Sequence, residues 1–150
     1  MNRNTINIII SGDIIKKYTV PTIEESNGQK VPDMQHEHIL SINSKQFETA
    51  IKELKNVSDS TTFETKNQNF SVSAAGDINK LCIPLDSEII KDSNVLCKYP
   101  LDFLLKFVAA KQLKEKVRLS FGETYPLKIE YNDTYGFNLT FILAPRVETD

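Results

Sequence analysis

The side chains best suited to chemistry are two histidines and twenty carboxylates. His36 and His38 alternate in a His-Glu-His run, so on a strand they point to the same side and could form a metal pair. The sequence places no third ligand beside them, and a pair of surface histidines is the simpler interpretation. Glycine-rich phosphate loops and Gly-x-Ser-x-Gly motifs are absent, and the acidic residues are scattered. We therefore expect no catalytic site, no metal and no cofactor, with a small carboxylate nuclease as the enzymatic alternative.

The lysines form a more informative pattern. Lys52 and Lys55 fall in one predicted helix, Lys106 in another, and Lys111 and Lys114 follow closely. If both helices line one face, that face is positive and could contact DNA phosphates without reading the base sequence. Solvated helix surfaces explain the same lysines equally simply. The net charge of −2 argues against a dedicated nucleic-acid binder, although it allows opposite charges on opposite faces.

The two cysteines, Cys82 and Cys97, stand apart from each other inside apolar runs. Two such cysteines make neither a disulfide framework nor a zinc site, so we expect buried thiols in a reducing compartment. No secretory signal is visible, and no apolar run approaches the length of a membrane span. We therefore expect no membrane partner.

The order of predicted elements indicates an α+β domain with an internal structural repeat. Residues 5–10 and 14–22 read as a hairpin around Ser11-Gly12-Asp13, and the polar segment 24–35 is typical of an exposed linker. The remaining elements are a strand at 36–42, a helix after Asn43, strands at 61–65, 70–74 and 80–85, a connection at 87–93, a strand at 94–98, a helix with Pro100 in its first turn, and strands at 116–121, 127–131 and 137–143. Two β-α-β-β-β units back to back would place both helices on one face and antiparallel sheets outside.

Helical spacing of apolar residues supports both predicted helices. Asn43 and Gln46 are spaced like a capping box at the start of the first helix. Each helix then carries one apolar stripe. The stripes are Phe47, Ala50, Ile51 and Leu54 in the first helix, and Leu101, Leu104, Leu105 and Val108, widened by Phe103 and Phe107, in the second.

The last third of the chain resembles a known family. Residues 125–131 (YPLKIEY), 137–145 (FNLTFILAP) and 146–148 (RVE) are similar, in order, to the C-terminus of sliding clamps of the proliferating-cell-nuclear-antigen family. The resemblance extends back through 70–77 (FSVSAAGD) and 47–54 to Val31-Pro32-Asp33 and the hairpin. It implies the DNA clamp fold, with residues 1–23 as the end of the clamp's first domain, 24–35 as the interdomain connecting loop, 36–147 as the C-terminal domain and 148–150 as a tail.

The resemblance also implies a function. Such clamps are non-catalytic processivity factors that form a homotrimeric ring around double-stranded DNA during replication and repair. They recruit DNA polymerase, clamp loader, ligase and nuclease peptides through a hydrophobic groove, and they act in the nucleus, or in a viral replication compartment. The alternative is a monomeric, non-ring peptide-binding module that competes for clamp partners.

Three surfaces follow from the resemblance, residue by residue. In the family's DNA-facing positions, Lys52 matches a basic residue, whereas Thr49, Asp102 and Ala109 replace residues that are commonly Arg or Lys. Lys106, Lys111 and Lys114 could compensate, and Lys55 also belongs to the predicted DNA-facing set. The partner-peptide groove corresponds to Val31, Pro32, Pro126, Leu127, Ile142, Leu143, Ala144 and Pro145, residues that core packing could also explain. The subunit interface corresponds to two edge strands, with Ile15, Lys17, Tyr18, Lys80, Cys82 and Pro84.

Overall fold

The computed structural model describes residues 4–23 and 34–147, and the chain divides into two compact units, 1–33 and 34–150. The first unit is an antiparallel hairpin of β1 (Thr5–Ser11) and β2 (Ile15–Pro21), as predicted. Its register runs from Thr5 opposite Pro21 to Ser11 opposite Ile15. Every residue of both strands is exposed.

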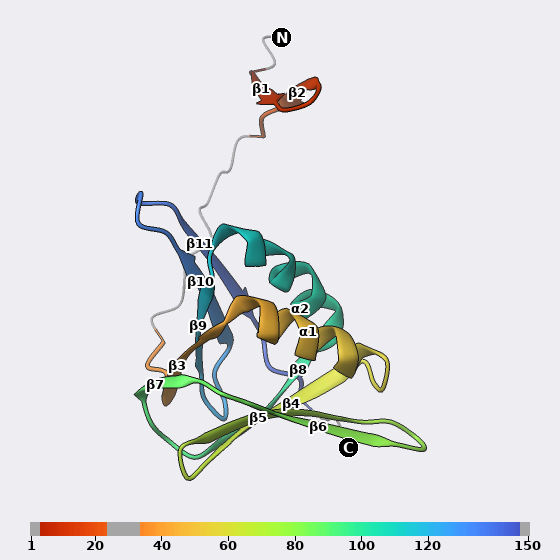
Figure 1. The fold of residues 1–150 in the computed structure, drawn as a ribbon, viewed down its shortest axis with the longest axis vertical. Helices are drawn as coiled ribbons and strands as arrows, with labels where there is room; N and C mark the ends of the chain where they lie inside the picture. Colours follow the sequence, from red (N-terminus) through yellow and green to blue (C-terminus); the bar gives the residue numbers. More distant parts are fainter. Residues whose placement is uncertain (1–3, 24–33, 148–150) are drawn as a thin grey trace. The chain divides into compact units, whose positions relative to one another are not determined.

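The second unit contains two antiparallel sheets and two α-helices, which confirms the α+β class (Figure 1). One sheet has the strand order β11-β10-β9-β3-β7 and the other the order β6-β5-β4-β8. In chain order the elements are β3 (His38–Asn43), α1 (Ser44–Lys55), β4 (Ser60–Lys66), β5 (Asn69–Ala75), β6 (Lys80–Leu85), β7 (Glu88–Lys91), β8 (Val95–Pro100), α2 (Leu101–Val108), the 3₁₀ helix η1 (Ala109–Leu113), β9 (Lys116–Phe121), β10 (Leu127–Asn132) and β11 (Asn138–Leu143).

The prediction of a plain connection at 87–93 is wrong. This segment contains the short strand β7, which pairs with β3 at the edge of the five-stranded sheet, with Ile89 opposite Leu40. Only Ile89 and Ile90 are apolar, and Ile90 is exposed, so the run is too short for alternation to be recognised. The second half of the repeat therefore has two strands before its helix.

Both the capping residue at the start of helix α1 and the apolar stripe along it favour a helix in this segment. The Asn43 side chain accepts hydrogen bonds from the backbone N–H groups of Lys45 (3.1 Å) and Gln46 (3.0 Å), as the sequence predicted for a capping residue. The predicted stripe is fully buried. The helix ends at Lys55, with Asn56 as its C-cap.

Helix α2 begins at Leu101, because Pro100 has an extended backbone and caps the helix rather than lying in its first turn. Leu101, Leu104 and Val108 are buried as predicted. Phe103 does not belong to the buried face, since 51% of it is exposed. Helices α1 and α2 lie side by side on one face of the sheets (Figure 1).

The core between the helices and the two sheets is built around Phe63 of β4. Its ring lies edge-on to four other rings, with centroids 5.1 to 6.2 Å away. These rings come from α1, from two strands of the four-stranded sheet and from β9 of the other sheet: Phe47, Phe70, Tyr99 and Phe121. The cluster joins the elements that carry the candidate surfaces, and its burial is a main source of their stability.

Within residues 4–23 and 34–147, neither helix is long and apolar enough to span a membrane.

Candidate functional site: three interaction surfaces

The predicted peptide groove gathers at one end of β10 and β11. Leu127 lies opposite Leu143 in the register, and both are buried, so these two leucines support the surface from below. Ile142 and Pro126 are half-buried, and Ala144 is exposed. The structure thus brings the C-terminal part of the predicted groove together, whereas Val31 and Pro32 lie outside the described residues.

A hollow of about 490 Å³ lies beside the predicted groove, between β8 and the residues after β11. The sequence did not predict it. The segment after β11 runs beside β8, where the backbone N–H of Arg146 donates to the carbonyl of Lys98 at 2.8 Å. The hollow is lined by Leu96, Cys97, Lys98, Glu123, Thr124, Pro145, Arg146 and Val147. Of the predicted groove, only Pro145 lines it. Leu96 of β8 is exposed in this lining, which the sequence alone does not indicate.

The two histidines do not form a surface pair, and that prediction is wrong. His36 and His38 are both buried. His36 lies 3.2 Å through Nε2 from the carbonyl of Pro126, and its own carbonyl accepts a 2.7 Å hydrogen bond from Lys91. Burial lowers the pKa of both imidazoles. No cluster of three or more metal-ligating side chains occurs in the described part of the chain.

The predicted subunit edge on β6 is open. Among the described strands, β6 is terminal in its sheet and pairs only with β5. Lys80, Cys82 and Pro84 are exposed and alternate with half-buried apolar residues. The prediction that both thiols are buried is therefore wrong for Cys82, while Cys97 is buried.

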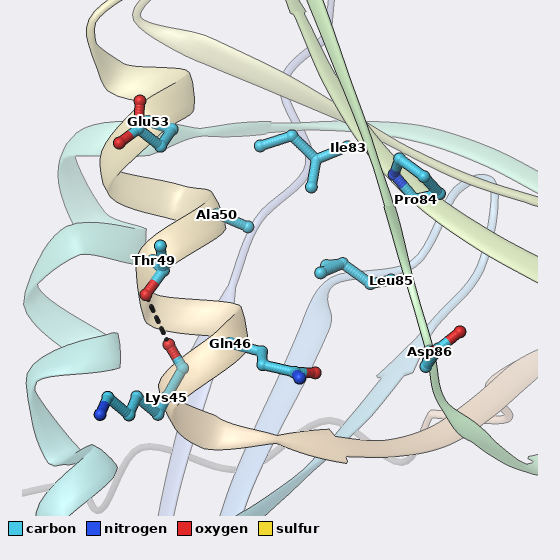
Figure 2. A pocket seen from close by; sticks show the side chains of 9 residues that line it. All are labelled: Lys45, Gln46, Thr49, Ala50, Glu53, Ile83, Pro84, Leu85 and Asp86. Atoms are coloured by element: carbon cyan, nitrogen blue, oxygen red, sulfur yellow. Dashed lines mark hydrogen bonds between the residues drawn. The ribbon is translucent and has the colours of Figure 1, made fainter.

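A hollow of about 710 Å³ separates β6 from α1 (Figure 2). Ile83 and Leu85 point from β6 toward the helix, where Ala50 lies. Lys45, Gln46, Thr49 and Glu53 contribute a polar rim. An apolar floor beside an open strand edge is suited to receive another β-strand with its side chains.

On the hairpin unit, the three residues predicted for the second edge, Ile15, Lys17 and Tyr18, are exposed on β2. Strand β2 has only β1 as a neighbour among the described strands. In the part of the chain that the structure describes, both predicted edge strands thus have unpaired backbone groups on one side.

The third surface lies on α1, α2 and the residues after them, and its lysines are largely paired with carboxylates. Lys52 and Lys111 contact the same oxygen, Oε1 of Glu48, at 2.8 and 2.6 Å. Lys55 pairs with Asp102 at 2.8 Å and with Asp59. The Lys52–Glu48 and Lys55–Asp59 pairs have the i,i+4 spacing of neighbours on a helix. The Lys111–Glu48 pair could not be predicted from the lysine spacing, because its two residues are 63 positions apart in the chain.

The electrostatics of this surface follow from those pairs. Hydrogen bonds from Lys111 and then Lys52 lower the pKa of the Glu48 carboxyl. Hydrogen bonds to Asp102 and Asp59 raise the pKa of Lys55. Lys106 lies 5.7 Å above the ring of Phe103, and Lys114 is half-exposed. The surface carries cations, but most of them already have anionic partners.

The family model and the curated relatives that match this chain are all of sliding clamps. The family model described as "Proliferating cell nuclear antigen, C-terminal domain" matches residues 30–146. Curated relatives named DNA polymerase sliding clamp include one from Thermoplasma volcanium, 28% identical over 127 residues, which covers 79% of this chain and 52% of the relative. Another, from Nanoarchaeum equitans, is 26% identical over 152 residues, covering 96% and 61%.

A solved structure shares the fold. The proliferating cellular nuclear antigen of Entamoeba histolytica superposes with a TM-score of 0.82 at 22% identity, covering 96% of this chain and 60% of that one. The chain thus spans roughly half to three fifths of the length of the proteins it matches.

Proposed function

The chain belongs to the family of the proliferating cell nuclear antigen C-terminal domain, and from this we propose that it is a sliding-clamp subunit, or a part of one, that serves as a processivity factor for DNA polymerase. In this role it helps to encircle double-stranded DNA and breaks no bond. The observation that carries the proposal is the juxtaposition of a two-helix layer with an open edge strand, β6, in a domain of clamp fold.

The helix layer supports a DNA-facing role because α1 and α2 present Lys52 and Lys106 to solvent. Phosphate contacts from such lysines are independent of base sequence, as a protein that moves along DNA requires. The open edge of β6 supports ring closure, because pairing with another subunit would satisfy its free backbone groups. In the proposed ring, β2 of one subunit supplies the partner strand.

The end of β10 and β11 supports recruitment of partners. Half-buried Ile142 and Pro126 offer apolar surface to a short peptide with aromatic anchors, as interface hot spots require. We expect polymerase, clamp-loader, ligase and nuclease peptides of the clamp-interaction type to bind here.

Solution mass tests the assembly. Light scattering on the purified chain, over a range of concentrations, should detect a closed oligomer whose mass stays constant once formed. If the chain is monomeric throughout, it does not close a ring alone. Addition of a polypeptide that contains the N-terminal domain of a clamp then decides between a clamp part, which would associate with it, and the monomeric peptide-binding module, which would not.

Peptide binding tests the groove separately. A fluorescein-labelled clamp-interaction peptide should bind the wild type, and Ile142→Asp should weaken its affinity at least tenfold, since a charge in an apolar contact remains unpaired. Thr140→Asp is the matched control, because Thr140 is exposed on the same face of β11 two residues away. Equal affinity of the wild type and both variants would exclude this end of the sheet as the groove.

A further inference from the structure

Two cations of the helix layer are held by one buried carboxylate, that of Glu48. Glu48 lies on α1, and its side chain is only 7% exposed. The same oxygen, Oε1, accepts from Lys52 of α1 and from Lys111 of η1. Lys52 is one helical turn from Glu48, whereas Lys111 comes from the other half of the domain. The carboxylate therefore collects two of the five lysines that were expected to face DNA.

We propose that Glu48 acts as an internal substitute for a phosphate group, which competes with the DNA backbone for Lys52 and Lys111 and keeps the affinity of the helix layer for polyanions low. This role of Glu48 rests on the proposed function, in which the helix layer faces DNA. The competing ligand is the phosphodiester backbone of a duplex, and no base contact is involved.

Geometry explains why the competition favours the carboxylate. Contacts of 2.6 and 2.8 Å are typical of charge-assisted hydrogen bonds, which are stronger than those between neutral groups. The Glu48 side chain is only 7% exposed, so water screens its attraction to the two lysines less than it screens a fully exposed pair. It is also positioned in advance, whereas a phosphate must be brought from solution. A lysine that leaves Glu48 would leave a buried carboxylate with one cation fewer, and this is costly.

The neighbouring charges extend the same effect. Lys55 is bound between Asp59 and Asp102, so a third lysine has anionic partners. Asp102 stands at the surface of α2, where it also lowers the potential that a phosphate would meet. Within residues 4–23 and 34–147, Lys106 and Lys114 are the cations of the predicted set that have no carboxylate partner. The wild type should thus make few phosphate contacts through this layer.

Substitution of Glu48 tests the competition. Glu48→Gln keeps the shape and an acceptor oxygen but removes the charge, which frees Lys52 and Lys111 for phosphate. Binding of the full chain to a fluorescein-labelled 30-base-pair duplex is measured by anisotropy at several salt concentrations. Since each neutralised phosphate contributes about 0.9 to the slope of log K against log salt, the variant's slope should steepen by about 1 to 2.

Glu53→Gln is the matched control. Glu53 is exposed on the same helix, and its carboxylate makes no ion pair among the described residues. It produces the same change in net charge without releasing a lysine. If Glu53→Gln steepens the slope as much as Glu48→Gln does, overall charge explains the effect and the proposed role of Glu48 is wrong. Urea unfolding of both variants verifies that each is folded under the binding conditions.

A second readout needs no DNA. Acetylation by a limiting amount of acetic anhydride, quantified at each lysine by mass spectrometry, should be several-fold faster at Lys52 and Lys111 in Glu48→Gln, and unchanged at Lys106. Unchanged rates at all three lysines would overturn the role of Glu48 while leaving the proposed function intact. Faster acetylation without a steeper salt slope would also overturn it, and would place the failure in the proposed DNA-facing role of the helices.

Discussion

The backbone N–H of Ser93 donates a 3.1 Å hydrogen bond to Nδ1 of His38, across the junction between β7 and β8. Because Nδ1 is the acceptor, the proton of the neutral ring is on Nε2, which is buried without a hydrogen-bond partner in the described structure. The ring packs 5.3 Å from that of Phe121, while Asp92 lies 3.6 Å from Nδ1 at the surface. The fold therefore selects the uncharged imidazole.

Acidification should destabilise the domain through this histidine. Burial lowers the pKa of His38 below 6.5, so the unfolded chain binds the proton more readily than the folded one. The stability that neutral His38 contributes is present above pH 6.5 and is lost as the pH falls through its lowered folded pKa. The free energy of unfolding, from urea titrations at pH 7.5 and pH 5.5, should be smaller at the lower pH.

His38→Asn provides the comparison, because its side chain can still accept from Ser93 but cannot be protonated. We expect this variant to be less stable at pH 7.5 and to lose less stability on going to pH 5.5. His36, whose pKa is also lowered by burial, contributes in the same direction, so His36→Gln serves as the parallel variant. An unaltered pH dependence in His38→Asn would show that His38 is not the group that titrates.

Loss of the helix cap should weaken α1. Asn43→Ala removes the acceptor for two backbone N–H groups, those of Lys45 and Gln46, and should lower the free energy of unfolding by about 1 kcal/mol. The matched control is Asn56→Ala at the other end of the helix, where only the backbone takes part in capping. That change should stay within about 0.5 kcal/mol. Chemical denaturation measures both, and equal losses would argue against the cap.

Truncation of the central ring should be far more damaging than loss of the cap. Phe63 touches four aromatic rings at the meeting point of the sheets and α1, so Phe63→Ala leaves a cavity and should cost about 3–5 kcal/mol. Phe103→Ala removes an equal ring from a half-exposed site and should cost much less. The same urea titrations compare the two variants. A similar loss in both would contradict the central position of Phe63.

The sequence predicted those features that depend on local pattern. Alternation and helical spacing located nearly every strand and both helices, and Asn43 was identified as a cap because its partners are two and three residues away. The strand β7 was missed since Ile89 and Ile90 give too short a run. Burial of His38 was missed because it depends on Phe121, which is distant in the chain. The Glu48–Lys111 pair was missed for the same reason, because residue spacing along the chain does not reveal a contact between the two halves of a domain.

The two cysteines give a direct test of edge-strand pairing. Cys82 is exposed on β6, whereas Cys97 is buried and burial raises the pKa of its thiol. A disulfide reagent that releases a coloured thiolate should therefore react rapidly with one thiol per chain under native conditions and with two in denaturant. In Cys82→Ser the rapid phase should disappear. If the β6 edge pairs with another subunit, the rapid phase should slow as the chain concentration rises through the range in which light scattering detects assembly. A rate that stays constant while the mass increases would show that the chain assembles through another surface.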